Sequence, residues 1–135
     1  MSAWQKLAWF NLAVVASTVI LVVALIPILG PTRAQGGFGV LGLLGFAPWF
    51  LRGGSGVLED ERDRMIRSRS SVIAFWIFWL AFVAACMSLP ARYGWDGLVP
   101  VSVVLSGVWY GVMMVVGVMA VTTLVMYRLE GADAT

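Results

Sequence analysis

Apolar residues run in four long stretches along the chain, and one charged run separates the second stretch from the third. The stretches cover residues 4–29, 36–51, 72–89 and 98–127, and Lys6 is the only charged residue within them. About 18 apolar residues suffice for a helix to cross the hydrocarbon core of a bilayer, which is about 30 Å thick. The pattern predicts an all-α polytopic membrane protein with four transmembrane helices, folded as a single domain over residues 1–135.

The basic residues are distributed unequally between the loops that join these stretches. If both termini and the loop 52–70 face the cytoplasm, seven of the nine basic residues lie inside, and only Arg33 and Arg92 lie outside. This asymmetry follows the positive-inside rule, which counts Lys and Arg rather than net charge. We therefore expect an N-in/C-in, multi-pass protein of the cell inner (cytoplasmic) membrane. Five of the basic residues share one loop with four acids, so we expect contact with membrane lipids and not with nucleic acid.

Glycines recur at a spacing of three in the second stretch. They are Gly36, Gly39, Gly42 and Gly45. Glycine in a helix costs about 1 kcal/mol relative to alanine in water, and in membranes the usual compensation is close approach of a partner helix. In an α-helix this spacing drifts around the axis, so we expect a spiral packing track that faces mainly the first helix. A substrate groove is the alternative.

Small residues also line the fourth stretch, where Gly107 and Gly111 form a GxxxG motif. Such motifs arise easily in glycine-rich spans and are weak indicators of dimerisation. We expect this motif to pack against the third helix within the same chain.

The charged run from Glu59 to Arg69 predicts a cytoplasmic helix over about 58–71 that continues without a break into the third span and ends near Leu89. Asp60 and Asp63 have the spacing of a capping box, and acids precede arginines, which suits the helix dipole. We expect one set of these residues to contact a protein partner: Asp60, Glu61, Arg62, Asp63 and Ile66. Arg64, Arg67 and Arg69 are expected to lie at anionic lipid headgroups.

Two other interpretations of the charged run remain open. It is also compatible with a solvated, salt-bridged helix that merely begins the third span. Its acidic residues could instead bind a divalent cation, but the interleaved arginines neutralise them and the spacing differs from that of an EF-hand loop.

The run Asp60-Glu61-Arg62-Asp63, followed by Ile66 and then by basic residues before a transmembrane helix, resembles the signature of a group of small uncharacterised prokaryotic membrane proteins. That resemblance implies four transmembrane helices with the motif in the cytoplasmic loop before the third. In this chain Arg67-Ser68-Arg69-Ser70-Ser71 is more polar than the segment that usually follows the motif. No activity comes with the resemblance.

The residue types present exclude several classes of function. The chain has no His and one cysteine, Cys86, and its spans lack the ionisable residues that carriers, pumps and voltage sensors place in the membrane. We therefore expect no catalytic residue, metal or cofactor. The favoured hypothesis is a non-catalytic accessory or scaffolding subunit that binds other membrane-protein subunits. The alternatives are a homo-oligomeric protein that binds or exports a small solute or lipid, and a membrane sensor that sequesters a cytoplasmic regulator.

Overall fold

The computed structural model describes residues 2–47 and 61–132, and this part of the chain is helical with no strand. Its elements are α1 (Ala3–Ala34), the 3₁₀ helix η1 (Gln35–Phe46), α3 (Glu61–Tyr93) and α4 (Val101–Ala132). The predicted all-α class is confirmed. Three helices, α1, α3 and α4, are long and apolar enough to cross a membrane.

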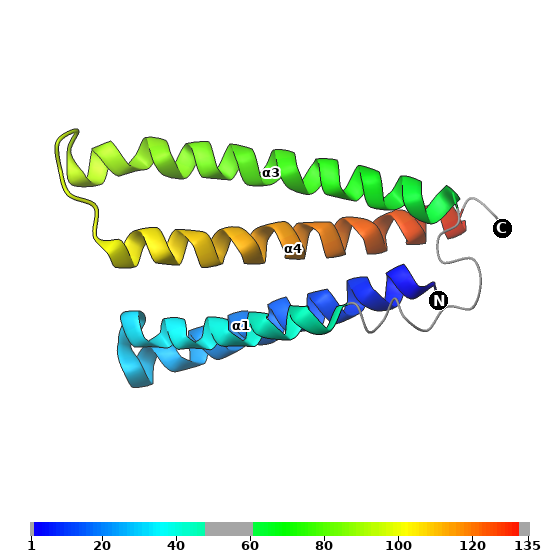
Figure 1. Cartoon of the computed structure of the whole chain (residues 1–135), viewed down its shortest axis with the longest axis horizontal. Coiled ribbons are helices and arrows are strands. Elements are labelled where there is room, and N and C mark those ends of the chain that lie inside the picture. Colours follow the sequence, from blue (N-terminus) through cyan, green and yellow to red (C-terminus); the bar gives the residue numbers. More distant parts are fainter. Residues whose placement is uncertain (1, 48–60, 133–135) are drawn as a thin grey trace.

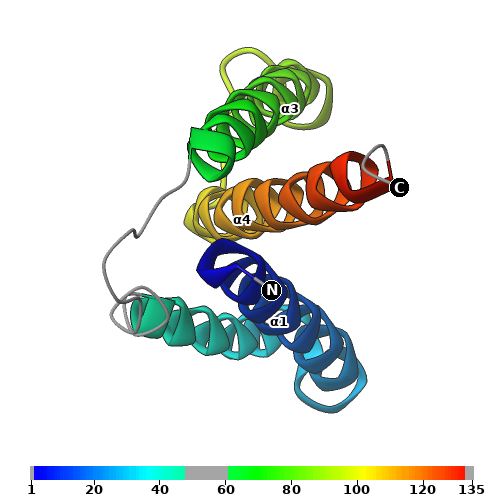
Figure 2. The ribbon, with the colours of Figure 1, turned by 90° about the vertical axis from the view of Figure 1, so that its right-hand side faces the viewer.

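The helices form an open, sequential arrangement instead of a closed four-helix bundle. α4 packs between α3 and α1, and η1 folds back along α1, so the spatial order is α3, α4, α1, η1 (Figures 1 and 2). The start of α1, the start of α3 and the end of α4 lie together at one end of the molecule (Figure 1). As a result, α3 has a single major neighbour, whereas α1 and α4 each have two.

α1 begins and ends at residues that satisfy or interrupt its backbone hydrogen bonds. Ser2 and Gln5 form a capping box, in which the Ser2 hydroxyl accepts from the Gln5 N–H and the Gln5 side chain accepts from the Ser2 N–H. At Gly30 the backbone takes a φ of 77°, a conformation that favours glycine, and this breaks the helix before Pro31. The predicted end of the first span near residue 29 therefore coincides with the break.

The second stretch differs from its prediction in both conformation and packing. η1 is a 3₁₀ helix of 12 residues, so it extends about 24 Å at the typical rise of about 2.0 Å per residue, short of the about 30 Å of a bilayer core. No fourth α-helix of spanning length is seen among the described residues, and residues 48–51 of the predicted span lie outside them. With three residues per turn, glycines at a spacing of three form a straight row instead of a spiral.

That glycine row is turned away from α1, contrary to expectation. A Cβ added at Gly39, Gly42 or Gly45 would meet nothing within 4 Å. The glycine that does approach α1 is Gly37, where an added Cβ would lie 2.9 Å from Cγ2 of Val22. Phe38 and Leu41 are also three residues apart, so they form a second row along η1. This row is buried on α1 and α4 and leaves the glycines on the opposite side.

α3 confirms the predicted continuous helix but ends one turn later than expected. It continues through Pro90 to Tyr93, where Gly94, with a φ of 77°, donates its N–H to the Pro90 carbonyl at 2.8 Å. Within α4, the two glycines of the GxxxG motif differ. An added Cβ at Gly111 would lie 3.1 Å from the Phe78 ring of α3, whereas Gly107 has no neighbour within 4 Å.

The main hydrophobic core joins α1, η1 and α4. Its buried members are Val14, Val22, Phe38 and Leu41. The Phe38 ring stacks on Trp109 of α4 at a centroid distance of 6.0 Å and meets Tyr110 edge-on at 5.2 Å. η1 is therefore anchored to α1 and α4 through Phe38 and Leu41, of which Phe38 is the larger and the more deeply buried.

Candidate functional site

Polar side chains from three helices meet at the end of the molecule where the chain begins. We call this cluster the three-helix junction; it consists of Ser2, Trp4 and Asn11 at α1, Asp63, Ile66 and Arg67 of α3, and Thr123 and Tyr127 of α4. The residues are brought together because α3 starts and α4 ends at the level of the first turns of α1 (Figure 1).

A relay of hydrogen bonds crosses the junction. The Gln5 N–H donates to the Ser2 hydroxyl at 3.2 Å, and that hydroxyl donates to the Tyr127 oxygen at 3.2 Å. The Tyr127 hydroxyl in turn donates to a carboxylate oxygen of Asp63. The bonds all run in one direction, so each donor is polarised by the next bond. Through this relay the first residue before α1, the start of α3 and the end of α4 are tied to one another.

Two arginines of α3 lie over aromatic rings in the same region. The Arg67 guanidinium is 4.9 Å from the centroid of the Trp4 ring, and that of Arg62 is 5.9 Å from the Tyr127 ring. Both distances are within the range of cation–π attraction. Arg67 therefore connects α3 to α1, two helices that otherwise make little backbone contact.

The structure divides the predicted partner-contact residues into two groups. Ile66, only 1% exposed, is buried at the junction, and Asp63 accepts the Tyr127 hydroxyl. Ile66 is therefore not part of the accessible surface, whereas Asp63 is half-buried and keeps part of its surface accessible. Their positions follow from the packing of α3 on α4, which turns one side of the charged helix inward. Asp60 lies outside the described residues.

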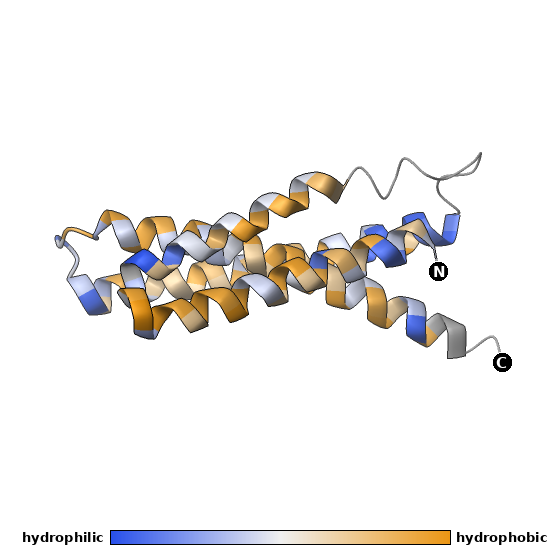
Figure 3. Ribbon diagram, turned by 90° about the horizontal axis from the view of Figure 1, so that it is seen from below, coloured by the Kyte–Doolittle hydropathy of each residue, from blue (hydrophilic) through white to orange (hydrophobic). Residues whose placement is uncertain are grey.

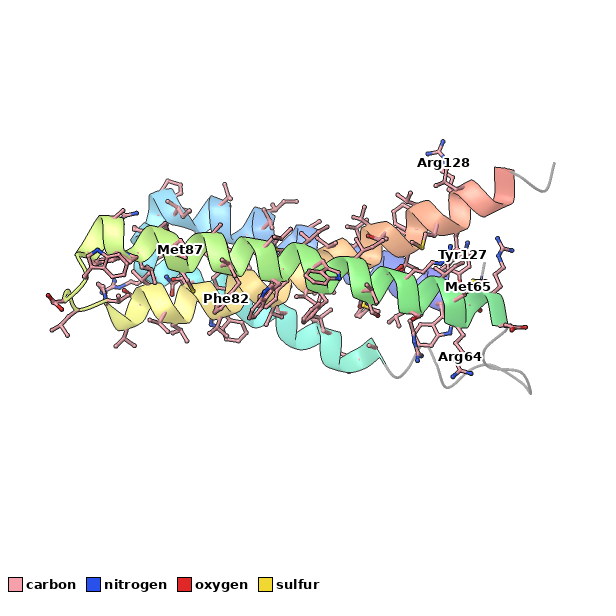
Figure 4. The ribbon with its side chains drawn as sticks, turned by 90° about the horizontal axis from the view of Figure 1, so that it is seen from above. Arg64, Met65, Phe82, Met87, Tyr127 and Arg128 are labelled. Atoms are coloured by element: carbon pink, nitrogen blue, oxygen red, sulfur yellow. The ribbon has the colours of Figure 1, made fainter. Side chains whose placement is uncertain are left out.

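The other predicted contact residues are exposed. Glu61 and Arg62 stay accessible in the first turn of α3, as do the residues assigned to lipid headgroups: Arg64, Arg67 and Arg69. Arg64 extends away from the helices in Figure 4, whereas Tyr127 lies beside α3. The exposed charged side chains at the start of α3 are thus mainly basic.

Sequence reasoning missed Ser2, Trp4 and Tyr127 as members of the site. A signal existed for Ser2, because Ser-x-x-Gln before an apolar run is a capping-box pattern. No local pattern indicates the contact between Asp63 and Tyr127, which are 64 residues apart in the chain.

The junction is suited to positioning helices, because its hydrogen bonds and its cation–π contact link α1, α3 and α4. Across residues 2–47 and 61–132, no three or more His, Cys, Asp or Glu side chains gather closely enough to hold a metal ion. The only carboxylate in the junction, Asp63, already accepts a hydrogen bond from Tyr127. Comparison of the chain with protein-family models, with curated proteins and with solved structures finds no match.

Proposed function

We propose that the protein is a non-catalytic integral membrane protein that serves as a small accessory or scaffolding subunit of a larger membrane complex. The observation that carries the proposal is the outer face of α3. Only 6% of the residues in the spanning window of this helix are buried within the chain, the same share as in α4 and less than the 17% of α1. A helix with one major neighbour leaves most of its surface for lipid or for another protein.

The side chains on that face favour a protein. Phe75, Trp79 and Phe82, which we call the aromatic face of α3, are between 47% and 57% exposed and stack on one another. Phe75 lies 6.5 Å from Trp79 between ring centroids, and Trp79 lies 5.9 Å from Phe82. Large, mutually ordered aromatic rings are typical anchors of protein interfaces.

The indole of Trp79 gives a second reason to expect a protein, and not lipid, against this face. Its indole N–H has no acceptor among the described residues, and its position near the middle of the apolar part of α3 is far from the interfacial belts where Trp usually finds water. An unsatisfied donor is costly in hydrocarbon. A neighbouring protein that offers an acceptor would remove that cost, and lipid tails would not.

Orientation and location form part of the same proposal. Among the described residues, six basic side chains lie toward the end of the molecule that contains the junction, and Arg33 and Arg92 lie toward the other (Figure 3). The positive-inside rule then favours the junction in the cytoplasm, with both termini inside, in a prokaryotic inner membrane. The resemblance through the Asp-Glu-Arg-Asp run points to the same class of protein.

Purification of tagged chain in a gentle detergent tests the accessory-subunit proposal. We expect wild-type chain to recover other membrane proteins in a fixed ratio, measured by native mass spectrometry. The triple variant Phe75→Leu, Trp79→Leu and Phe82→Leu should lose these proteins while keeping its own fold. Phe46→Leu is the matched control, because Phe46 is an exposed ring on η1. Recovery of chain alone, or equal recovery by the triple variant, would contradict the proposal.

The glycine row of η1 favours a second candidate, a homo-oligomer that binds or exports a small solute or lipid. Gly39, Gly42 and Gly45 present a smooth, exposed backbone to which a second copy could approach closely. Because Cys86 is the only cysteine, Cys86→Ala gives a background for crosslinking. Gly42→Cys should then form a disulfide-linked dimer, and Leu43→Cys, on another side of η1, should not. Failure of Gly42→Cys to crosslink would eliminate this candidate.

A further inference from the structure

The aromatic face of α3 belongs to a longer row of exposed side chains with the spacing of a coiled-coil seam. Alternating steps of four and three residues join six exposed positions, which we call the α3 seam: Ser68, Val72, Phe75, Trp79, Phe82 and Cys86. Such alternating steps are the heptad pattern, in which one row of side chains packs against a second helix. Helix pairs in membranes mostly cross in the same left-handed way, at about +20°.

The α3 seam lies on the side of the helix away from α4. Four buried or half-buried side chains mark the opposite side: Ile66, Ser70, Ala74 and Phe78. At 3.6 residues per turn, the middle of this buried row is about 140° around the helix from the middle of the seam. Figure 2 shows α3 at the end of the row of helices, with α4 on one side only. The helices that the structure describes therefore leave the seam uncovered.

Two arginines flank the start of the α3 seam. Arg64 is four residues before Ser68 and Arg69 directly follows it, so the two arginines occupy heptad positions g and e, and both side chains are exposed. Side chains at g and e lie on the two edges of a helix seam and select its partner through ion pairs. The seam therefore carries positive charge on both edges, at the end that the proposed orientation places in the cytoplasm.

These charges disfavour a second copy of the chain on the α3 seam. Two copies inserted in the same orientation bring their α3 helices together in parallel. In a parallel pair, the g residue of one helix meets the e residue five positions later in the other, so Arg64 of each copy would face Arg69 of its neighbour. Glu61, one heptad before Ser68, would also face its own equivalent. Like charges placed against each other suppress a wrong pairing, whereas acids opposite the arginines favour the right one.

We propose that the α3 seam binds a transmembrane helix of another membrane protein, and that this helix carries acidic side chains at its cytoplasmic end, opposite Arg64 and Arg69. The inference rests on the proposed accessory function and names the chemistry of the partner. Small residues on the partner helix allow the rings of Phe75, Trp79 and Phe82 to pack closely, and a hydroxyl or carbonyl on it accepts the Trp79 indole N–H. The rings supply the packing and the arginines supply the selection.

A designed peptide and the native Cys86 test the proposal with the full chain in phosphatidylcholine nanodiscs. The peptide is a single transmembrane helix with Ala and Ser at heptad positions a and d, Glu at the e and g positions of its cytoplasmic end, and a cysteine level with Cys86. We expect it to form a disulfide with Cys86 at least about tenfold faster than the same peptide with Lys in place of Glu, because attraction to the arginines becomes repulsion.

Variants of the chain show whether the arginines and the α3 seam cause that preference. Arg64→Glu/Arg69→Glu should reverse it, so that the Lys peptide reacts faster. Arg92→Glu, at an exposed arginine on the other end of the same helix, should leave it unchanged. Cys86→Ala/Met87→Cys moves the thiol to a 73%-exposed position outside the seam and should react slowly with both peptides. A rate at this position equal to that at Cys86 would contradict docking on the seam.

Other occupants give different results in the same experiment. A disulfide between two copies of Cys86 that outcompetes the mixed disulfide would identify a second copy on the α3 seam. Equal rates with the Glu and Lys peptides would mean that Arg64 and Arg69 serve lipid headgroups. Either result would overturn the proposal.

Purification in a gentle detergent separates this inference from the accessory function on which it rests. We expect Arg64→Glu/Arg69→Glu to lose the membrane proteins that wild-type chain recovers in a fixed ratio, while Arg92→Glu keeps them. Equal recovery by the double variant would overturn the acidic partner and leave the accessory-subunit proposal intact. Recovery of wild-type chain alone would contradict the accessory-subunit proposal itself.

Discussion

α1 and α3 are similar in length and both are apolar enough to span a membrane, yet they differ in how many other helices they pack against. α1 packs against α4 on one side and η1 on another, and it buries Val14, Val22 and even Thr18, whose hydroxyl donates to the Val14 carbonyl at 2.8 Å. α3 packs mainly on α4 and leaves its aromatic face exposed. Hydropathy therefore indicates which segments cross a membrane, but it does not indicate which of their faces meet protein.

The largest expected loss of stability is in the core that α1 forms with η1 and α4. Phe38→Ala removes the 1%-exposed ring that joins η1 to α1 and α4, and substitutions of this kind cost about 3–5 kcal/mol of unfolding free energy. The loss can be measured by SDS titration of purified chain in mild detergent. Phe46→Ala, at a 60%-exposed ring of the same helix, should change the free energy by less than about 0.5 kcal/mol. Equal effects would mean that η1 is not anchored through Phe38.

The next effect concerns the contact between η1 and α1. A leucine at Gly37 must displace Cγ2 of Val22, which even an added Cβ approaches to 2.9 Å, and such overpacking costs about 1–3 kcal/mol. Gly39→Leu is the matched control, since an added Cβ there meets nothing within 4 Å. The same titration should show that Gly37→Leu is the less stable variant. The reverse order would place the glycine row, and not Gly37, against α1.

A smaller effect is expected where α3 meets the other helices at the junction. Tyr127→Phe removes the hydroxyl that bonds both Ser2 and Asp63. Each of the two bonds contributes about 0.5–1.5 kcal/mol, and because both are only part-buried we expect the lower end of that range for each. Hydrogen exchange should also increase in the first turns of α3. Tyr110→Phe, a half-exposed tyrosine with only a ring contact to Phe38, should alter neither quantity. An unchanged exchange rate in Tyr127→Phe would show that the relay does not hold α3 in place.

The smallest effect on stability is expected at the aromatic face of α3. Trp79→Leu should change the unfolding free energy of the isolated chain by less than about 0.5 kcal/mol, because the side chain is 47% exposed and the rings that it stacks on belong to the same helix. A large loss of stability in the isolated chain would show that the aromatic face supports the fold itself, and would remove the contrast with α1.

Much of the architecture could be predicted from the order of residues. The three long helices follow from apolar length, the break in α1 from Gly30 before Pro31, and the continuous charged helix from the acid-first pattern after residue 60. The conformation of η1 could not be predicted in this way. A spacing of three is compatible with either a drifting α-helical track or a straight 3₁₀ row, and burial of Phe38 on α1 and α4 selects the second.

The candidate site was only partly predictable, because it too depends on contacts between residues that are distant in the chain. The sequence directed attention to Asp63, Ile66 and Arg67, but not to the side chains they meet. Ile66 and Asp63 face inward because Tyr127, 64 residues later, arrives at their level on α4.

By itself, the sequence determined that this chain is helical and apolar enough to enter a membrane. Transfer of a segment from water to hydrocarbon depends on its own length and composition, and these are local properties. The tertiary structure alone decided which faces are buried, which glycines approach a neighbour and which polar side chains meet at the junction. Those outcomes depend on contacts between residues distant in the chain, and no local pattern encodes the partner that each side chain meets.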